Sequence, residues 1–375
     1  MQVDRAKREV WLDCWKGILI ILVVLGHLSG GAYHLAHGES QVILQYIFKL
    51  IYTFHMPAFF FISGYTYREG ENWYHKKIQR LIVPYFVFGV ISVLLYWVMQ
   101  DGVKSLFLKA ESTAFYSDHI GVRGICGCLL SLVHGGGWPN GEGFRYNSVL
   151  WFLPCMFVGL LAFKPVARRG VVGVSVFMFV CVIAKICFAL PGNLPWGVSL
   201  VPWYCIFICL GWFAKRYSIF NCGESGYRRI MLLIGMIFLY GIAAYLLPNP
   251  SHLRQHSAGR LLLLLIAIGG CYVSGQIAKA VRGTWIAYIG MSSLGIMLTH
   301  KFLVVLIQTK IRCFRSLMDM SPLMAVLGVV LITVLITFTC IVLIWPIRRW
   351  MPWALGEFKY ESAAAPSERD KEKKD

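Results

Sequence analysis

Charge is scarce in this chain, and acidic charge is the scarcer kind. Only 14% of the 375 residues are charged, whereas a soluble globular domain has about 25%. Asp and Glu number 18 against 36 Lys and Arg, and no carboxylate lies inside a long apolar run. Hydrophobic residues make up 58% of the chain, and mean hydropathy is +0.63. This composition excludes a soluble globular protein and indicates an integral membrane protein.

Patterns for metal binding and disulfides are also missing. The 12 cysteines form no CxxC pair, and Cys126 and Cys128 are too close for an ordinary structural bridge. His34 and His37 are favoured as residues of a hydrated loop over metal ligands. We therefore expect no metal and no tightly bound cofactor. Eight cysteines lie in or beside apolar runs, where we interpret them as small hydrophobic residues: Cys14, Cys155, Cys181, Cys187, Cys205, Cys209, Cys271 and Cys340.

The apolar residues gather in ten runs that predict an all-α integral membrane fold of about ten transmembrane helices. No repeat of fixed period is present. The runs lie at about 16–33, 43–66, 81–100, 149–163, 171–190, 198–213, 229–247, 260–280, 285–308 and 322–345.

The net charge of +18 follows the topology of a membrane protein and does not indicate a nucleic-acid partner. Lys and Arg concentrate in every second connection, which predicts that both termini are cytoplasmic in a multi-pass protein of the inner membrane. Lys310, Arg312 and Arg315 are an exception to this alternation. We predict a transmembrane domain over 1–350 and a charged, disordered cytoplasmic tail over 351–375.

The long connection 101–148 is predicted to face outside and contains the Gly-rich run HGGGWPNGEG. A long loop in a compact membrane domain often carries function. The alternative is that 125–133 forms a short re-entrant or interfacial helix.

Polar residues inside the first run indicate a site. Lys16 and His27 are eleven positions apart, so they lie on nearly the same face of a helix and about 16 Å apart along its axis. His55 and His300 are predicted to lie at a similar depth. A single membrane histidine often only bonds to a neighbouring helix, but three at one depth favour a polar site. Neutral imidazole suits general-base chemistry near pH 7.

The cytoplasmic rim offers cations. Lys16 and Arg80 each begin an apolar run, and Lys77 lies close to Arg80. Such cations can bind phosphates, and Asp13 either complements the helix N-terminus or orients Lys16. A ligand with phosphates at this rim and a reactive end at His27 has the dimensions of an acyl-coenzyme A.

Five stretches carry a family resemblance: DCWKGILIILVVLGH, FHMPAFFFISGYTYR, KKIQRLIVPYFVFG, LWFLPCMFV and SLGIMLTHKFL. In this order, over most of 8–308, they resemble the integral membrane acyltransferase 3 family, and within it the fucose 4-O-acetylase-like and polysaccharide O-acetyltransferases. The resemblance implies a ten-helix domain that passes acyl groups, commonly acetyl from acetyl-CoA, to carbohydrate hydroxyls.

The family pattern also assigns residues. The family has an Arg followed, after ten residues, by a His, and these positions correspond to Lys16 and His27 in this sequence. Lys16 therefore keeps the charge of the Arg but not its bidentate geometry. Many relatives have Trp-Ser-Leu followed by Glu; this chain has LWFLP at 150–154, which supports Trp151 as a substrate-lining residue and gives no acidic partner. No soluble hydrolase-like domain follows the last run.

The sequence thus predicts a membrane O-acetyltransferase with acyl-CoA as co-substrate, a carbohydrate acceptor and membrane lipid as partners. His27 acts as general base or acyl carrier, and His55 and His300 polarise the thioester or orient the sugar. Trp138 at the outer mouth is favoured as a membrane anchor. Two other hypotheses remain at this stage: a secondary transporter or glycan-lipid flippase that uses membrane histidines, and a structural subunit of a glycan-synthesis complex.

Overall fold

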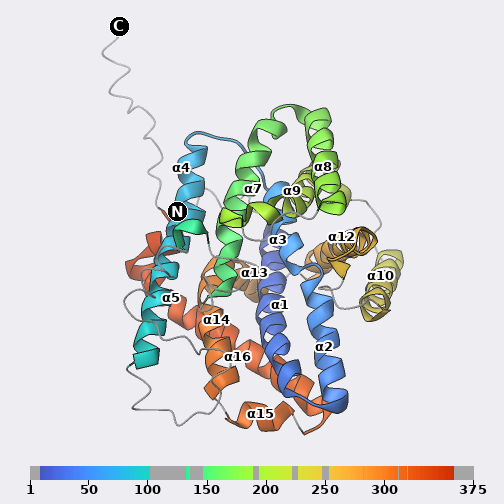
Figure 1. Ribbon diagram of the computed structural model, residues 1–375. Coiled ribbons are helices and arrows are strands. Elements are labelled where there is room, and N and C mark those ends of the chain that lie inside the picture. The colour runs from blue at the N-terminus through green and yellow to red at the C-terminus, as the bar shows by residue number, and fades with distance from the viewer. Residues whose placement is uncertain are drawn as a thin grey trace.

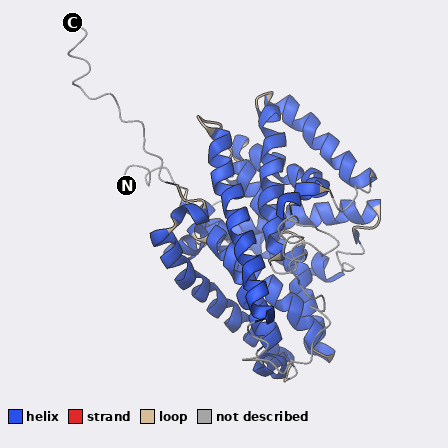
Figure 2. Ribbon diagram, turned by 60° about the vertical axis from the view of Figure 1, so that its left-hand side comes forward, coloured by secondary structure: helices blue, strands red, loops and turns tan. Residues whose placement is uncertain are grey.

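Every element of regular structure in the described residues is helical, which confirms the all-α prediction (Figure 2). The computed structural model describes residues 9–101, 132–135, 147–188, 194–221, 227–246, 253–281, 283–310, 312–318 and 320–358. Trp138 and most of the connection 101–148 lie outside these residues. The helices are α1 (Val10–Leu35), α2 (Gly38–Tyr52), α3 (His55–Tyr65), α4 (Trp73–Lys77), η2 (Ile78–Ile82), α5 (Val83–Asp101), η4 (Ser148–Trp151), α7 (Phe152–Ala167), α8 (Gly170–Cys187), η5 (Pro195–Leu200), α9 (Val201–Arg216), η6 (Ile219–Asn221), α10 (Tyr227–Leu246), α12 (Ser257–Ala280), α13 (Thr284–Met291), α14 (Ser293–Lys310), α15 (Arg312–Met318), α16 (Pro322–Trp350) and η7 (Pro352–Leu355).

All ten predicted runs fall on helices, but fewer of them form full straight spans. In the described chain, eight helical segments are long and apolar enough to cross a membrane. A ninth candidate is the bent pair Thr284–Met291 and Ser293–Gln308. The run 229–247 falls on α10, whose apolar part Leu233–Leu246 is shorter.

Helix α1 runs through the middle of the molecule, where it contacts α2, α3, α12, α13, α14 and α16 (Figure 1). Its buried side chains belong to the main hydrophobic core, together with residues of α3, α7 and α9. The described cysteines are free, and all but Cys187 are buried, as expected for small hydrophobic residues. Because α1 is continuous from Val10 to Leu35, the predicted separation of about 16 Å between Lys16 and His27 holds.

Glycines allow two pairs of helices to pack backbone against backbone. A Cβ on Gly64 of α3 would lie 2.0 Å from the carbonyl oxygen of Ile208, and one on Gly211 of α9 would lie 1.9 Å from that of Phe61. Gly17 of α1 and Gly290 of α13 face each other's helices in the same way. Small residues at such crossings are typical of membrane helices, where close packing replaces the hydrophobic effect.

Prolines explain two irregularities near the predicted site. Pro57 lacks an N–H and its ring crowds the carbonyl four residues back, so α2 ends at Tyr52 and α3 begins at His55. Pro84 likewise leaves the carbonyl of Arg80 without its helical donor, and the chain forms the π-helical turn η2 there. The predicted single helix over 43–66 is therefore broken immediately before His55.

The run 285–308, predicted as one helix, forms two helices in the structure. The chain bends by 77° between α13 and α14. Ser292 lies at the break, where its Oγ accepts a hydrogen bond from Nη1 of Arg348 at 3.2 Å. Serine side chains compete with the helical backbone for hydrogen bonds, and a run of apolar residues does not reveal such a break.

Ion pairs join several connections that the charge pattern assigns to one side. Arg168 Nε donates to both carboxylate oxygens of Glu69 at 3.0 Å, and Lys164 Nζ lies 3.5 Å from the same carboxylate. The hydrogen bonds from Arg168 hold the pKa of Glu69 below its usual value. Glu9 pairs with Lys215 in the same manner. The cytoplasmic assignment of this side stays a prediction.

The predicted tail is partly packed. Within 351–375, η7 is helical, and Leu355 is only 2% exposed. Gly356 follows with φ +69° and packs against the backbone of Arg80. Residues 359–375 lie outside the described chain.

Candidate active site

The structure brings the three predicted histidines together around a tyrosine. The rings of His27 on α1 and His300 on α14 have centroids 5.4 Å apart. Tyr52, the last residue of α2, lies between His27 and His55: its hydroxyl is 2.8 Å from Nδ1 of His27, and its ring centroid is 4.8 Å from that of His55. We call His27, Tyr52, His55 and His300 the histidine cluster. The break before α3 places Tyr52 and His55 beside His27, and the packing of α14 on α1 places His300 there.

Two of these histidines are fixed in one tautomer. Nδ1 of His55 lies 2.8 Å from the carbonyl of Ile51, and Nδ1 of His300 lies 2.9 Å from that of Ile296. A carbonyl can only accept, so each neutral ring carries its proton on Nδ1 and presents Nε2 as an acceptor. Both side chains are buried, at 3% and 0% exposure.

His27 differs from them because it is only partly buried. Its Nδ1 is bonded to the Tyr52 hydroxyl, which can donate or accept. When Nδ1–H donates to Tyr52, Nε2 carries a free lone pair, which is the form a general base or a nucleophile needs. The direction of the hydrogen bond with Tyr52 therefore sets which ring nitrogen of neutral His27 keeps a free lone pair.

Sequence reasoning missed Tyr52 and Gln308. Tyr52 precedes His55 by three residues, a spacing that places both on one helical face. Gln308 of α14 donates from Nε2 to the carbonyls of His27 at 3.1 Å and Leu28 at 3.2 Å. Gly31 makes room for it, since a Cβ there would lie 2.1 Å from that nitrogen. Gln308 thus fastens α1 at the level of His27.

At the other end of α1, Asp13 orients Lys16. Nζ of Lys16 lies 3.4 Å from Oδ1 of Asp13, whose side chain is 6% exposed while that of Lys16 is 31% exposed. The charge of Lys16 is thereby held at the surface of the described structure. This geometry favours the orienting role predicted for Asp13.

Arg80 and Lys77 lie on the neighbouring elements η2 and α4. Arg80 is exposed, and Lys77 Nζ lies 5.6 Å from the centroid of the Trp73 ring. Within the described residues, no contact joins either of them to Lys16.

Trp151 on η4 packs against an aromatic residue of α9. Its ring centroid lies 5.5 Å from that of Tyr204, which stacks on Phe60 at 4.1 Å. The ring is partly buried, and its predicted role in substrate binding stays a prediction.

A search of protein families gives a match over nearly the whole chain. The profile described as "Acyltransferase domain" of the acyltransferase 3 family matches residues 9–345. The chain belongs to the acyltransferase 3 family. This membership and the membrane-spanning helices of the described chain favour a multi-pass membrane acyltransferase over the transporter and structural-subunit hypotheses.

Curated relatives agree with this membership. "Inner membrane protein YcfT" of Escherichia coli is 23% identical over 381 residues, which cover 96% of this chain and 98% of that protein. "Glucans biosynthesis protein C" of Escherichia coli is 29% identical over 117 residues, or 28% of this chain and 30% of that protein.

A shorter match has a higher sequence identity. "Nodulation protein NolL" of Sinorhizobium fredii is 50% identical over 58 residues, 16% of this chain. The chain spans 15% of the length of the nodulation proteins that it matches. No solved structure matches the chain.

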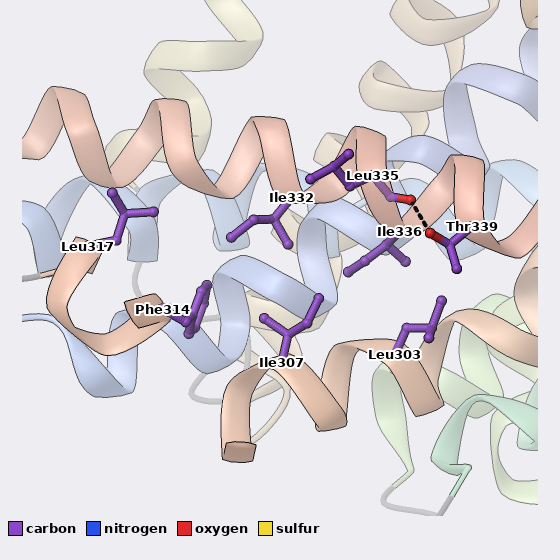
Figure 3. A pocket seen from close by; sticks show the side chains of 8 residues that line it. All are labelled: Leu303, Ile307, Phe314, Leu317, Ile332, Leu335, Ile336 and Thr339. Carbon is purple, nitrogen blue, oxygen red and sulfur yellow. Dashed lines mark hydrogen bonds between the residues drawn. The ribbon is translucent and has the colours of Figure 1, made fainter. Parts of the chain in front are cut away.

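A cavity of about 270 Å³ lies between α14, α15 and α16 (Figure 3). Seven of its lining side chains are hydrocarbon or aromatic, and the eighth, Thr339, donates its hydroxyl to the carbonyl of Leu335 at 2.8 Å. It therefore offers no free polar group for acyl-transfer chemistry, although Leu303 on its wall is only one turn from His300.

Tyr52→Phe is expected to slow acyl transfer by about tenfold to 100-fold, because His27 loses the partner that fixes its ring and tautomer. The fold should be kept, since only the hydroxyl is removed. The measurement is kcat together with the melting temperature of the purified protein. Tyr33→Phe on α1 is a matched control, because no hydrogen bond of its hydroxyl is among those described. Unchanged kcat in Tyr52→Phe would contradict the role of Tyr52.

Proposed function

We propose that the protein transfers an acyl group, acetyl in the first instance, from cytosolic acyl-CoA to a hydroxyl of a cell-envelope carbohydrate in the inner membrane. The observation that carries the proposal is the histidine cluster. The cluster brings together three imidazoles, including that of His27, and the phenol of Tyr52. It lies about 16 Å along α1 from Lys16, whose charge is paired with Asp13.

In the general-base route, Nε2 of His27 takes the proton of the sugar hydroxyl as its oxygen attacks the thioester carbonyl carbon. The carbon–sulfur bond then breaks, and the proton passes to the departing thiolate to give free coenzyme A. The Nδ1–H bond to Tyr52 supports the positive charge that His27 carries between these steps.

In the acyl-carrier route, Nε2 of His27 itself attacks the thioester and coenzyme A leaves first. The sugar hydroxyl oxygen then attacks the acyl carbon, and the carbon–nitrogen bond to the imidazole breaks, which regenerates the Nε2 lone pair. The hydroxyl proton passes through solvent to the released thiolate to give free coenzyme A. Both routes need the same tautomer of His27. They differ in that only the second releases coenzyme A before an acceptor is present.

The carbohydrate acceptor is supported by a relative whose name states that it acts in the biosynthesis of glucans. The inner membrane is supported by the name of the relative that aligns over 96% of this chain. The direct test is release of free coenzyme A from acetyl-CoA by the purified protein. NMR of O-acetyl groups in envelope glycans of parent and deletion strains tests the acceptor, and equal signals would contradict the proposal.

Lys16→Ala is expected to raise KM for acetyl-CoA by about tenfold with a smaller change in kcat, because one exposed phosphate contact is removed. Lys16→Arg should behave like the wild type, since the charge remains and Asp13 can orient it. The measurement is initial rate against acetyl-CoA concentration. Equal KM in all three proteins would show that Lys16 only anchors the helix.

A further inference from the structure

Lys301 is a cation inside the membrane domain, one residue after His300 in α14. It belongs to the bent pair of helices that forms the ninth candidate span, and its side chain is partly buried. In the part of the chain that the structure describes, no carboxylate pairs with Lys301 and no hydrogen bond holds its ammonium group. Lysines inside spans are rare, and one without a counter-ion indicates a functional site.

Helical spacing places Lys301 on the face of α14 that meets α1. Gln308 follows Lys301 by seven residues, which is two turns and nearly the same face of the helix. Nε2 of Gln308 donates to the carbonyls of His27 and Leu28, so this face lies against α1 beside His27. Lys301 lies about 10 Å nearer the start of α14 along the helix axis.

The preceding residue, His300, connects Lys301 to the histidine cluster. The ring of His300 lies 5.4 Å from that of His27, and the charge of Lys301 acts electrostatically on both imidazoles. Nε2 of His300 has no hydrogen-bond partner, so the ammonium group is near the rings without being bonded to that nitrogen. His27 and Lys301 both keep some exposed surface, which a ligand needs in order to contact them.

The charge of Lys301 lacks compensation in this environment. An isolated ammonium group in a nonpolar interior is costly, and neutral imidazoles do not balance it. The histidine cluster contains no carboxylate, and none lies inside the long apolar runs of the chain. The negative charge therefore has to come with the ligand or arise during the reaction. Acyl transfer creates such a charge, because attack on the thioester carbonyl puts negative charge on its oxygen.

We propose that Lys301 is a catalytic residue whose ammonium group donates a hydrogen bond to the thioester carbonyl oxygen and stabilises the oxyanion that forms there. The inference rests on the proposed function. When the sugar oxygen or Nε2 of His27 bonds to the carbonyl carbon, the electron pair of the C=O π bond moves to the oxygen beside Lys301. When the carbon–sulfur bond breaks, that pair re-forms the carbonyl, and the sulfur leaves with the bonding electrons. Lys301 keeps its proton throughout.

The test uses Lys301→Met in the full-length protein in nanodiscs, since Met is similar in length and carries no charge. With acetyl-CoA and a panel of methyl glycosides, kcat should fall by about 100-fold to 1,000-fold, the range for loss of one oxyanion donor. KM for acetyl-CoA should change little, because the interaction forms fully only in the transition state. The melting temperature should be equal to or higher than that of the wild type, because an unpaired charge is removed.

Two further variants separate the charge from the packing. Lys301→Arg keeps the charge and should recover at least about tenfold of the lost kcat. Lys185→Met on α8 is the matched control, because Lys185 is also a lysine of an apolar helix. The charges that act on Lys185 are those of Arg254 and Arg260. The control should keep the kcat and KM of the wild type.

A raised KM for acetyl-CoA with unchanged kcat would overturn the proposal, because Lys301 would then bind the substrate and the transition state equally. Equal losses of kcat in Lys301→Met and Lys301→Arg would also overturn it, since the charge would not matter. If the wild type transfers no acetyl from acetyl-CoA, the proposed function fails and this inference falls with it. If the wild type and Lys301→Met are equally active, only the assignment of Lys301 fails.

Discussion

His27→Ala is expected to abolish acyl transfer while the protein still folds and inserts at normal levels. The loss should be at least about 100-fold and up to about 10⁴-fold, the range for removal of a general base, and complete if His27 carries the acyl group. His27 is only partly buried, so its truncation leaves the core intact. The measurements are release of free coenzyme A from acetyl-CoA and the O-acetyl content of envelope glycans.

His34→Ala is the matched control for this variant. His34 lies two turns further along the same helix, is exposed, and stacks only on its neighbour Tyr33 in the described contacts. It should retain wild-type transfer. His27→Gln should be as inactive as His27→Ala, because an amide can bond to Tyr52 but cannot take a proton at neutral pH. Retained transfer in either His27 variant would exclude the mechanism.

The membrane fold could be predicted because apolar runs and charge alternation are local signals. All ten runs lie on helices, including the run on α10, whose apolar part is short. The bend of 77° at Ser292 could not be predicted, since both sides of it are apolar and the break depends on a contact with Arg348 from α16. A long-range contact of this kind leaves no pattern in a single sequence.

The histidine cluster was predicted by a depth argument that was only partly sound. For His27 it holds, since α1 is straight and continuous. For His300 the depth was counted from residue 285 along one helix, but that helix is bent. His300 nevertheless lies beside His27, because α14 packs against α1. Depth along separate helices therefore identified histidines that lie together in the structure, but not Tyr52, which lies at a helix end created by Pro57.

The side-chain contacts that fasten α1 and η4 to α14 could not be predicted from the sequence. Gln308 is 281 positions away from His27, and its role depends on the absence of a side chain at Gly31. Asn147 precedes the LWFLP motif, and its Nδ2 donates to the carbonyl of Leu298 on α14. Neither residue type is unusual in a membrane protein, so only the fold shows what each one contacts.

Gly290→Ala is expected to destabilise the protein severely, because α1 and α13 pack backbone against backbone. The added Cβ would lie 1.8 Å from the carbonyl oxygen of Asp13, and real Cβ atoms essentially never approach within 3.0 Å. A rigid backbone cannot yield as a flexible side chain does, so the cost should be about 3 kcal/mol or more. Unfolding monitored by size-exclusion chromatography after heating should show a fall in apparent melting temperature on the order of 10 °C.

Gly17, on the α1 side of the contact with α13, provides a second test, since a Cβ there would lie 2.1 Å from the carbonyl oxygen of Ile286. Gly17→Ala should therefore destabilise to a similar degree. Gly269→Ala on α12 is the control: its Cβ would meet nothing within 4 Å, so stability should be unchanged or higher. Because Asp13 both receives this contact and orients Lys16, any protein that survives Gly290→Ala should also bind acetyl-CoA more weakly. If Gly290→Ala and Gly269→Ala melt alike, α1 and α13 do not pack as the structure shows.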